Sequence, residues 1–318
     1  MKKALICGIS GQDGAYLAKL LLAKGYEVYG TSRDAQVTSF SNLIKLGIKD
    51  RVKLLSMSLT DFRSVIQAIK QTNPDEIYNL AGQTSVGLSF EQPVETLESI
   101  TVGTLNLLES IRFMNNEIKF YNACSSECFG NTYSPATEAT AFNPRSPYAA
   151  AKAAAFWITS NYREAYKIFA CSGILFNHES PLRPERFVTQ KIISAAIRIA
   201  NGSKEKLNLG NLDVIRDWGW APEYVESIYL MMQNNTPEDF VIATGESHSL
   251  KEYVSLVFSE LNLNWEDNCS IDNSLIRPAD LMISAGNPAK AANILNWKAK
   301  FKMHESIKQM IQAKLNNM

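Results

Sequence analysis

The feature that most constrains the fold is a glycine-rich turn near the N-terminus. The apolar run Ala4–Cys7 leads into this turn, and apolar residues then recur at helical spacing over Tyr16–Lys24. Glycine lets a backbone approach a pyrophosphate closely, and the N-terminus of the following helix offers it unpaired amides. Strand, turn and helix stand in the order that this motif requires. The sequence therefore predicts a dinucleotide site at Gly8, Ser10, Gly11, Gln12, Asp13 and Gly14.

Short apolar runs continue to alternate with helical patterns through the first half of the chain. Such alternation produces right-handed crossovers and a parallel sheet that is covered by helices on both faces. We therefore expect an α/β fold with a Rossmann-type doubly wound parallel sheet. The expected strands are Ala4–Cys7, Glu27–Gly30, Val52–Met57, Glu76–Leu80, Lys119–Cys124 and Phe169–Leu175, and the expected helices are Tyr16–Lys24, Phe62–Lys70, Val94–Phe113 and Tyr148–Ala165.

The alternation breaks after about residue 175. We expect residues 1–175 to form the cofactor-binding Rossmann domain. Residues 176–318 are expected to form mainly a smaller C-terminal substrate-binding lobe, and the return of some of its segments to the main sheet is left open. The elements expected there are helices at Phe187–Ala200, Pro222–Met232, Leu250–Leu261 and His304–Leu315, and strands at Leu207–Gly210 and Phe240–Ala243.

Composition and charge exclude several classes of protein. Lys+Arg and Asp+Glu both number 32, so there is no overall basic field to recruit nucleic acid or an anionic membrane. No apolar stretch approaches the length of a membrane span. The five cysteines are odd in number and lie mostly in strand-like contexts, which favours reduced thiols and a cytoplasmic protein. With three histidines and no paired Cys/His spacing, we expect no metal site.

The end of the second strand bears on the choice between NAD and NADP. An acidic residue there bonds the ribose hydroxyls, whereas arginine favours a 2′-phosphate. The chain reads Thr31-Ser32-Arg33-Asp34 at this point. Ser32 and Arg33 suit the phosphate and Asp34 opposes it, so the sequence favours NADP and leaves NAD open.

Two groups of residues suggest acid–base chemistry. Tyr148 and Lys152 stand four residues apart on one helix face, where a neighbouring ammonium stabilises a phenolate and lowers its pKa. With 12 tyrosines in the chain, this spacing alone could be accidental. The fifth strand, however, ends in Ser125-Ser126-Glu127, at the edge where a parallel sheet binds ligands. Such a string is ordinarily a helix cap or a polar turn, but in this position it is expected to add hydroxyls and a carboxylate to the site.

Together these motifs resemble the extended short-chain dehydrogenase/reductases and, more narrowly, the GDP-mannose 4,6-dehydratase family. The resemblance spans nearly the whole chain. The glycine and Tyr/Lys patterns define only the superfamily, whereas Gly173–Pro181 and Leu209–Gly219 are long and specific. Segments that carry it are Gly8–Gly14, Tyr78–Gln83, Ser89–Pro93, Pro144–Tyr148, Gly173–Pro181, Arg183–Lys191, Leu209–Gly219 and Arg277–Ala279.

The resemblance implies roles for individual residues. Tyr148 would remove the proton of the sugar 4-hydroxyl, Lys152 would tune it and hold the nicotinamide ribose, and Ser125 would bond the 4-oxygen. Glu127 would remove the C5 proton and assist loss of the C6 hydroxyl, with Ser126 beside it. Leu80 and Ala81 would contact the cofactor. The implied substrate is GDP-mannose or a related GDP-sugar, with contacts from Ser85, Asn177, Lys191, Arg216 and Arg277.

Some residues depart from the family pattern. Arg33 is followed by Asp34 where the family carries consecutive arginines that help bind NADP and join subunits. A homo-oligomer, dimer or tetramer, is nevertheless expected. Alternatives are a dehydratase for another GDP-sugar, a 4-keto-reductase or 4-epimerase of the same fold, and a non-catalytic NADP-binding sensor. Glu127 argues against the reductase and the epimerase, and the intact Tyr148/Lys152 pair argues against the sensor. His178 is expected to be a hydrogen-bonded structural residue, and Glu185, Arg183 and Arg186 are further candidates for the substrate pocket.

Overall fold

The computed structural model describes residues 1–114, 117–275 and 279–316. Its centre is a seven-stranded, wholly parallel sheet in the order β11-β6-β5-β4-β1-β2-β3. The expected doubly wound α/β fold is therefore confirmed. The strands are β1 (Lys3–Cys7), β2 (Glu27–Ser32), β3 (Lys53–Ser56), β4 (Glu76–Asn79), β5 (Lys119–Ser125), β6 (Ala170–Leu175) and β11 (Phe240–Ile242).

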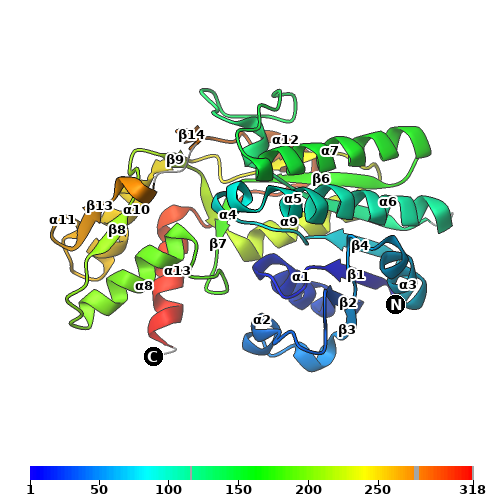
Figure 1. Cartoon of the computed structure of the whole chain (residues 1–318), viewed down its shortest axis with the longest axis horizontal. Helices are drawn as coiled ribbons and strands as arrows, with labels where there is room; N and C mark the ends of the chain where they lie inside the picture. The colour runs from blue at the N-terminus through cyan, green and yellow to red at the C-terminus, as the bar shows by residue number, and fades with distance from the viewer. Residues whose placement is uncertain (115–116, 276–278, 317–318) are drawn as a thin grey trace.

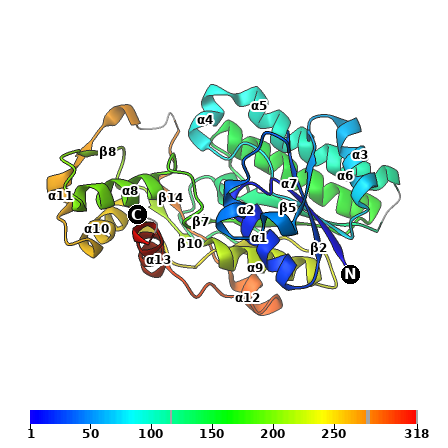
Figure 2. The ribbon, with the colours of Figure 1, turned by 90° about the horizontal axis from the view of Figure 1, so that it is seen from below.

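Helices cover both faces of the main sheet because its strands carry apolar residues on both sides. In β1, Ala4 and Ile6 join the core on one face, whereas Leu5 and Cys7 join the core on the other. The first face is covered by α1 (Gln12–Ala23) and α9 (Ala221–Gln233), which lie side by side (Figure 2). The second is covered by α3 (Phe62–Thr72), α6 (Gly103–Met114) and α7 (Pro147–Tyr166).

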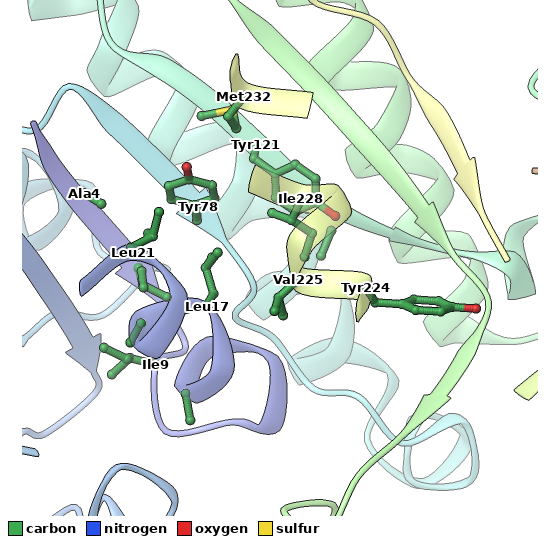
Figure 3. Close-up of a cluster of buried hydrophobic side chains, with 14 of the residues drawn as sticks. Ala4, Ile9, Leu17, Leu21, Tyr78, Tyr121, Tyr224, Val225, Ile228 and Met232 are labelled. Atoms are coloured by element: carbon green, nitrogen blue, oxygen red, sulfur yellow. The ribbon is translucent and has the colours of Figure 1, made fainter. Parts of the chain in front are cut away.

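The core of the first face fixes α1 relative to the sheet. Figure 3 shows Leu17 and Leu21 of α1 gathered with Val225 and Ile228 of α9 beside Tyr78 of β4. Leu17, Leu21 and Ile228 are fully buried, and burial of such a side chain contributes roughly 1.5–3 kcal/mol to folding. Since the glycine-rich turn immediately precedes α1, this packing also holds the turn in place.

The helix expected over Val94–Phe113 is present but is built from three pieces. It begins as α5 (Pro93–Leu97), passes through one π-helical turn (η2, Glu98–Val102) and continues as α6. A π-helical turn of this kind occurs within longer helices, so the apolar periodicity persists through it. Further short elements border the main sheet: α2 (Ser41–Lys45), η1 (Lys49–Arg51), α4 (Val86–Glu91), η3 (Ser126–Phe129) and α12 (Ala289–Ile294).

A smaller lobe lies beside the main sheet, on the left in Figure 1. Three of its helices pack on one another around a separate apolar core that includes Ile193, Val254 and Ile307. Its short strands form two- and three-stranded sheets with the orders β10-β7, β12-β9-β14 and β13-β8. Its elements are β7 (Asn177–Glu179), α8 (Val188–Ala200), β8 (Leu207–Leu209), β9 (Ile215–Arg216), β10 (Trp218–Trp220), β12 (His248–Ser249), α10 (Leu250–Glu260), α11 (Trp265–Asn268), β13 (Cys269–Ile271), η4 (Asn273–Leu275), β14 (Ile283–Ser284) and α13 (Met303–Leu315).

Three segments of the second half lie with the main sheet instead of the smaller lobe. β11 pairs with β6 in parallel, α9 packs against α1, and α12 packs against β11. The chain therefore crosses between the two parts more than once, and the cavity between them is lined from both.

Candidate active site

One cavity of about 520 Å³ lies at the carboxyl ends of the central strands and extends to the smaller lobe. Because the strands are parallel, the segments that follow β1, β4, β5 and β6 all open onto this edge. The structure brings most of the predicted site residues together in its wall: Gly8, Ser10, Gly11, Gln12, Asp13, Gly14, Leu80, Ser85, Ser125, Ser126, Glu127, Tyr148, Lys152, Asn177, Lys191 and Arg216.

The glycine-rich turn has the geometry that its sequence predicts. Gly8 adopts φ +81°, and a Cβ on Gly14 would lie 2.4 Å from the Gly8 carbonyl oxygen. α1 begins without a side-chain cap, because its N-cap residue is Gly11. The first amides of α1 therefore lack side-chain acceptors and, with the helix dipole, suit a phosphate. Asn42 of α2 donates to the Ser10 carbonyl at 3.0 Å and supports the turn from outside.

The Ser-Ser-Glu string acts both as a cap and as part of the cavity wall. β5 ends at Ser125, whose hydroxyl accepts a hydrogen bond from the Glu127 amide at 3.3 Å and so caps η3. Ser125, Ser126 and Glu127 all line the cavity. Ser125 and Ser126 are buried, whereas Glu127 is half-buried. The cap therefore fixes the direction of the string without removing its side chains from the site.

Tyr148 lies in the first turn of α7, opposite the end of β5. The Ser146 hydroxyl accepts from the Ala149 amide at 3.1 Å, and Pro147 occupies the first turn of the helix, so the start of α7 is well defined. Burial raises the pKa of the Tyr148 phenol above its ordinary value, although a hydrogen bond with Ser125 lowers it in part. Ser125 and Tyr148 are thus neighbours in space as well as in the expected chemistry.

Lys152 lies near Tyr148, as the four-residue spacing predicts, but its hydrogen bond goes to another group. Its ammonium donates to the Ala123 carbonyl at 2.7 Å and lies 5.9 Å from the centre of the Tyr148 ring. Burial lowers the pKa of Lys152 itself. The sequence predicted that the ammonium would leave Tyr148 with a lowered pKa. For the net pKa this prediction is wrong, because burial raises the pKa of the phenol by more than the hydrogen bond with Ser125 lowers it.

His178 is a hydrogen-bonded structural residue, as expected. It lies on β7, and its imidazole contacts Asp13 of the glycine-rich turn, with 3.0 Å between Nε2 and Oδ2. Its Nδ1 lies 2.7 Å from the Phe176 carbonyl oxygen. Gln12 joins the same contact, since its amide donates to the His178 carbonyl at 3.2 Å. The turn and β7 are therefore held together by polar contacts within the cavity wall.

The smaller lobe contributes cations at the other end of the cavity. Arg216 is buried, donates to the Ile215 carbonyl at 2.9 Å and forms an ion pair with Asp280 at 3.4 Å. Lys191 donates to the Asn208 carbonyl at 2.8 Å. Arg216 thus takes part in an ion pair, yet both cations line the cavity. Arg277 lies outside the described residues.

Three predicted cofactor residues lie away from the cavity wall. Ser32 accepts from the Thr38 hydroxyl at 3.1 Å, and the Arg33 side chain is 87% exposed and contacts Glu95 at 3.5 Å. Ala81 packs closely against the glycine-rich turn, since a Cβ on Gly8 would lie 2.9 Å from the Cα of Ala81.

The three additional candidates named for the substrate pocket have different surroundings. Arg183 lines the cavity beside Glu179, at 3.1 Å, and Arg186 also lines it, over the Phe187 ring. Glu185 instead forms an ion pair with Lys314 at 2.7 Å and is not part of the described cavity wall. Sequence reasoning did not single out several lining residues because each stands alone, without a spacing pattern that marks it as functional: Asn42, Thr84, Glu179, Asn208 and Asn211.

Two kinds of feature are absent from the described part of the chain. None of its helices combines the length and the apolar character that a membrane span requires. Within the same residues there is no cluster of three or more His, Cys, Asp or Glu side chains arranged to hold a metal ion.

Comparison with known proteins identifies close relatives. Residues 5–310 match the sequence model of a family described as GDP-mannose 4,6 dehydratase. The chain is 46% identical over 324 residues to GDP-mannose 4,6 dehydratase 2 of Arabidopsis thaliana, covering 99% of this chain and 87% of the relative. It is 43% identical over 338 residues to GDP-mannose 4,6 dehydratase of Cricetulus griseus, covering 98% and 91%. Among solved structures, it resembles UDP-glucose 4-epimerase of Thermus thermophilus in complex with NAD, with a TM-score of 0.87, 25% identity and coverage of 99% and 100%.

Proposed function

The chain belongs to the GDP-mannose 4,6-dehydratase family, a family of lyases, and from this premise we propose that it converts GDP-mannose to GDP-4-keto-6-deoxy-mannose with NADP that is recycled in every turnover. The observation that carries the proposal is the placement of Glu127 in one cavity wall with Ser125, Tyr148 and the glycine-rich turn. Oxidation at C4 needs a base and a hydride acceptor, whereas elimination of water needs a further acid–base group. Glu127 supplies that group.

The turn fits a nicotinamide dinucleotide. Side chains at Gly8 and Gly14 would collide with the backbone of Ala81 and of Gly8, so the tight turn requires glycine there, and the uncapped start of α1 suits the charge of a pyrophosphate. A nicotinamide dinucleotide held at this turn would supply a reversible hydride acceptor for the sugar. The protein's task is then to bind the sugar, to orient it and to move protons.

Each proton transfer can be assigned to a side chain of the cavity. Tyr148 takes the proton of the 4-hydroxyl while Ser125 holds the oxygen, so that C4 becomes a ketone. The C5 proton is then acidic, and Glu127 removes it. The C6 hydroxyl leaves as water after gaining a proton from Glu127, and Ser126 lines the same part of the cavity. Hydride at C6 and a proton at C5 complete the product. The proton that Tyr148 took from the 4-hydroxyl balances the one added at C5, so the net change is the loss of one water.

The smaller lobe is proposed to bind the GDP moiety. Arg216 and Lys191 supply positive charge at its end of the cavity, and Asn177 adds a polar group at the start of β7. A guanidinium matches phosphate oxygens in a planar fork, and an ammonium adds a compact charge. Asp280 keeps Arg216 oriented but does not remove it from the cavity wall.

NADP is the proposed form of the cofactor because of the end of β2. Arg33 is held by an exposed contact with Glu95, and such pairs stabilise by about 0–1 kcal/mol. Its guanidinium is therefore free to turn toward a 2′-phosphate. Asp34 is engaged elsewhere, since its carboxylate accepts from the Gln36 amide at 2.9 Å.

We also propose that the enzyme is a cytoplasmic homo-oligomer. Val94, Leu97 and Val102, which follow one another through α5 and η2, are exposed apolar residues. A second copy of the chain would remove this surface from water. Light scattering of the purified enzyme tests the proposal, and a monomer at micromolar concentration would contradict it.

The test of the activity is incubation of the purified enzyme with GDP-mannose, followed by mass spectrometry. We expect a product that has lost one water, formed without net consumption of NADP. An unchanged mass with inversion at C4 would identify an epimerase instead. A product formed only when stoichiometric NADPH is added would identify a reductase.

A further inference from the structure

Asp13 occupies an unusual position for an acidic residue. It is the second residue of α1, in the same turn that is proposed to hold the cofactor pyrophosphate, and it lines the cavity. A carboxylate at a helix N-terminus interacts favourably with the helix dipole. It would, however, repel a pyrophosphate bound to the neighbouring amides unless a cation compensated its charge.

His178 provides such a cation. Its Nδ1 faces the Phe176 carbonyl at 2.7 Å and its Nε2 faces the Asp13 carboxylate at 3.0 Å. A carbonyl oxygen only accepts hydrogen bonds, and an ionised carboxylate also only accepts. Both ring nitrogens must therefore donate, which makes His178 an imidazolium. The second Asp13 oxygen accepts from the Gln12 amide at 3.0 Å, as an ionised carboxylate requires.

The other charged groups around the ring do not take over this role. Arg183 donates to the His178 carbonyl at 3.4 Å and pairs with Glu179 at 3.1 Å, and its charge acts on Asp13 less strongly than that of His178. Tyr224 of α9 stacks on the imidazole with 4.6 Å between ring centres. On the side of the main sheet, Tyr121 and Lys152 are close enough to Asp13 for its negative charge to favour their protonated forms.

The titration of the pair agrees with this assignment. Burial alone would lower the pKa of His178, but the Asp13 carboxylate raises it above its ordinary value. Burial alone would raise the pKa of Asp13, but His178 and the hydrogen bonds from His178 and Gln12 lower it. Both shifts favour the doubly charged pair.

We propose that His178 is a positioning residue that compensates the charge of Asp13 and fastens the glycine-rich turn to β7, so that the turn can accept the cofactor pyrophosphate. This inference rests on the proposed binding of a nicotinamide dinucleotide at the turn. It assigns no proton transfer to the substrate to His178.

If His178 compensates the charge of Asp13, NADPH binding should change in a particular order among three variants. His178→Gln leaves the Asp13 charge uncompensated and should weaken NADPH binding by roughly tenfold or more. Asp13→Asn removes the carboxylate and should weaken it by only about threefold. In Asp13→Asn/His178→Gln, no charge is left to compensate, so the double variant should bind NADPH more tightly than His178→Gln alone.

The measurement is the dissociation constant of NADPH from the purified enzyme, followed by energy transfer from tryptophan to the reduced nicotinamide. GDP binding in the smaller lobe serves as the control for an intact fold. If the losses in the two single variants simply add in the double variant, His178 is only a structural contact and the proposal is wrong.

A pH titration keeps the proposal testable if His178→Gln does not fold. In the wild type, NADPH affinity should fall as the pH rises and His178 loses its proton, whereas Asp13→Asn should show a much smaller fall. Equal falls in the two proteins would overturn the proposal. Dehydratase activity is measured separately, because the same pattern of NADPH binding among the variants is compatible with an enzyme that catalyses another reaction. A wild type that binds neither NADPH nor NADH would overturn this inference together with the proposed cofactor.

Discussion

The Lys152 ammonium lies 5.9 Å from the centre of the Tyr148 ring, and its hydrogen bond goes to the Ala123 carbonyl. The ammonium therefore lies within cation–π range of the ring while its hydrogen bond is made elsewhere. Burial remains the largest influence on Tyr148 and holds its pKa above the ordinary value. Since the base must be deprotonated to act, the rate of the C4 oxidation should rise with pH.

Removal of the Lys152 charge should shift this pH dependence. In Lys152→Met the phenolate loses a nearby cation, so we expect the acid limb of the pH–rate profile to move to higher pH. The rate at neutral pH should fall by roughly 10²-fold. Lys152→Arg, which keeps the charge, is the control and should retain the position of the limb. A Lys152→Met profile that coincides with that of the wild type would refute the electrostatic role.

Replacement of Glu127 should separate oxidation from elimination. Glu127→Gln removes the carboxylate but not its volume, so C4 oxidation should proceed while loss of water slows by roughly 10²–10⁴-fold. Addition of GDP-mannose should then leave reduced cofactor on the enzyme, visible by its absorbance. The matched control is Glu226→Gln, at an exposed position of α9. Full dehydratase activity in Glu127→Gln would show that another group performs the elimination.

Substitution of Arg216 should weaken binding of the substrate more than binding of the cofactor. Arg216→Gln keeps hydrogen-bonding capacity but removes the charge, so the dissociation constant of GDP should rise by roughly 10- to 100-fold. NADPH binding should change little, because the turn lies at the other end of the cavity. Arg198→Gln is the control, since Arg198 pairs with Glu205 on the surface. Calorimetric titration with GDP measures the effect, and equal losses in both variants would contradict the assignment.

A methyl group at Gly14 should abolish cofactor binding. The Cβ of Gly14→Ala would lie 2.4 Å from the Gly8 carbonyl oxygen, so the turn would have to move. In contrast, the nearest atom to a Cβ on Gly87 is the Ser85 hydroxyl oxygen at 3.9 Å. Gly87→Ala should therefore bind NADPH like the wild type. Tight NADPH binding by Gly14→Ala would show that the pyrophosphate does not use this turn.

Asp217 should make the stability of the fold depend on pH. Burial raises its pKa from 3.8 to about 6, although the Thr244 and Gly245 amides donate to it. A carboxyl group with a raised pKa in the folded state stabilises at low pH, and this contribution is lost as the pH rises through about 6. The loss should be on the order of 3 kcal/mol. Urea unfolding of the wild type and of Asp217→Asn at pH values from about 4 to 7 measures it. Equal pH slopes would show that Asp217 does not contribute.

The sheet was predictable because most of its strands are continuous apolar runs between turn signals. β1, β4, β5 and β6 were placed to within one or two residues for this reason. β8 of the smaller lobe was also expected, whereas most of the other short strands there, such as β9 with two residues, carry no periodic signal and were missed. Most site residues could be named because they follow the strand ends or belong to recognisable segments.

Contacts between distant parts of the chain were not predictable in the same way. The Asp13–His178 pair joins residues that are 165 positions apart, and no local pattern encodes it. The raised pKa of Tyr148 depends on burial by several elements and not on the spacing of Tyr148 and Lys152. Arg33 is exposed because β2 ends at Ser32, one residue before it, and the local sequence does not reveal on which side of the chain its side chain then lies.

The central claim is that one hydride leaves C4 and returns to C6 of the same sugar as water is lost. Incubation of the enzyme with GDP-mannose that carries deuterium at C4, followed by mass spectrometry and NMR, tests it most directly. We predict a 4-keto-6-deoxy product that has lost one water and carries the deuterium at C6. Recovery of GDP-mannose without loss of water, or a dehydrated product without deuterium at C6, would contradict the account.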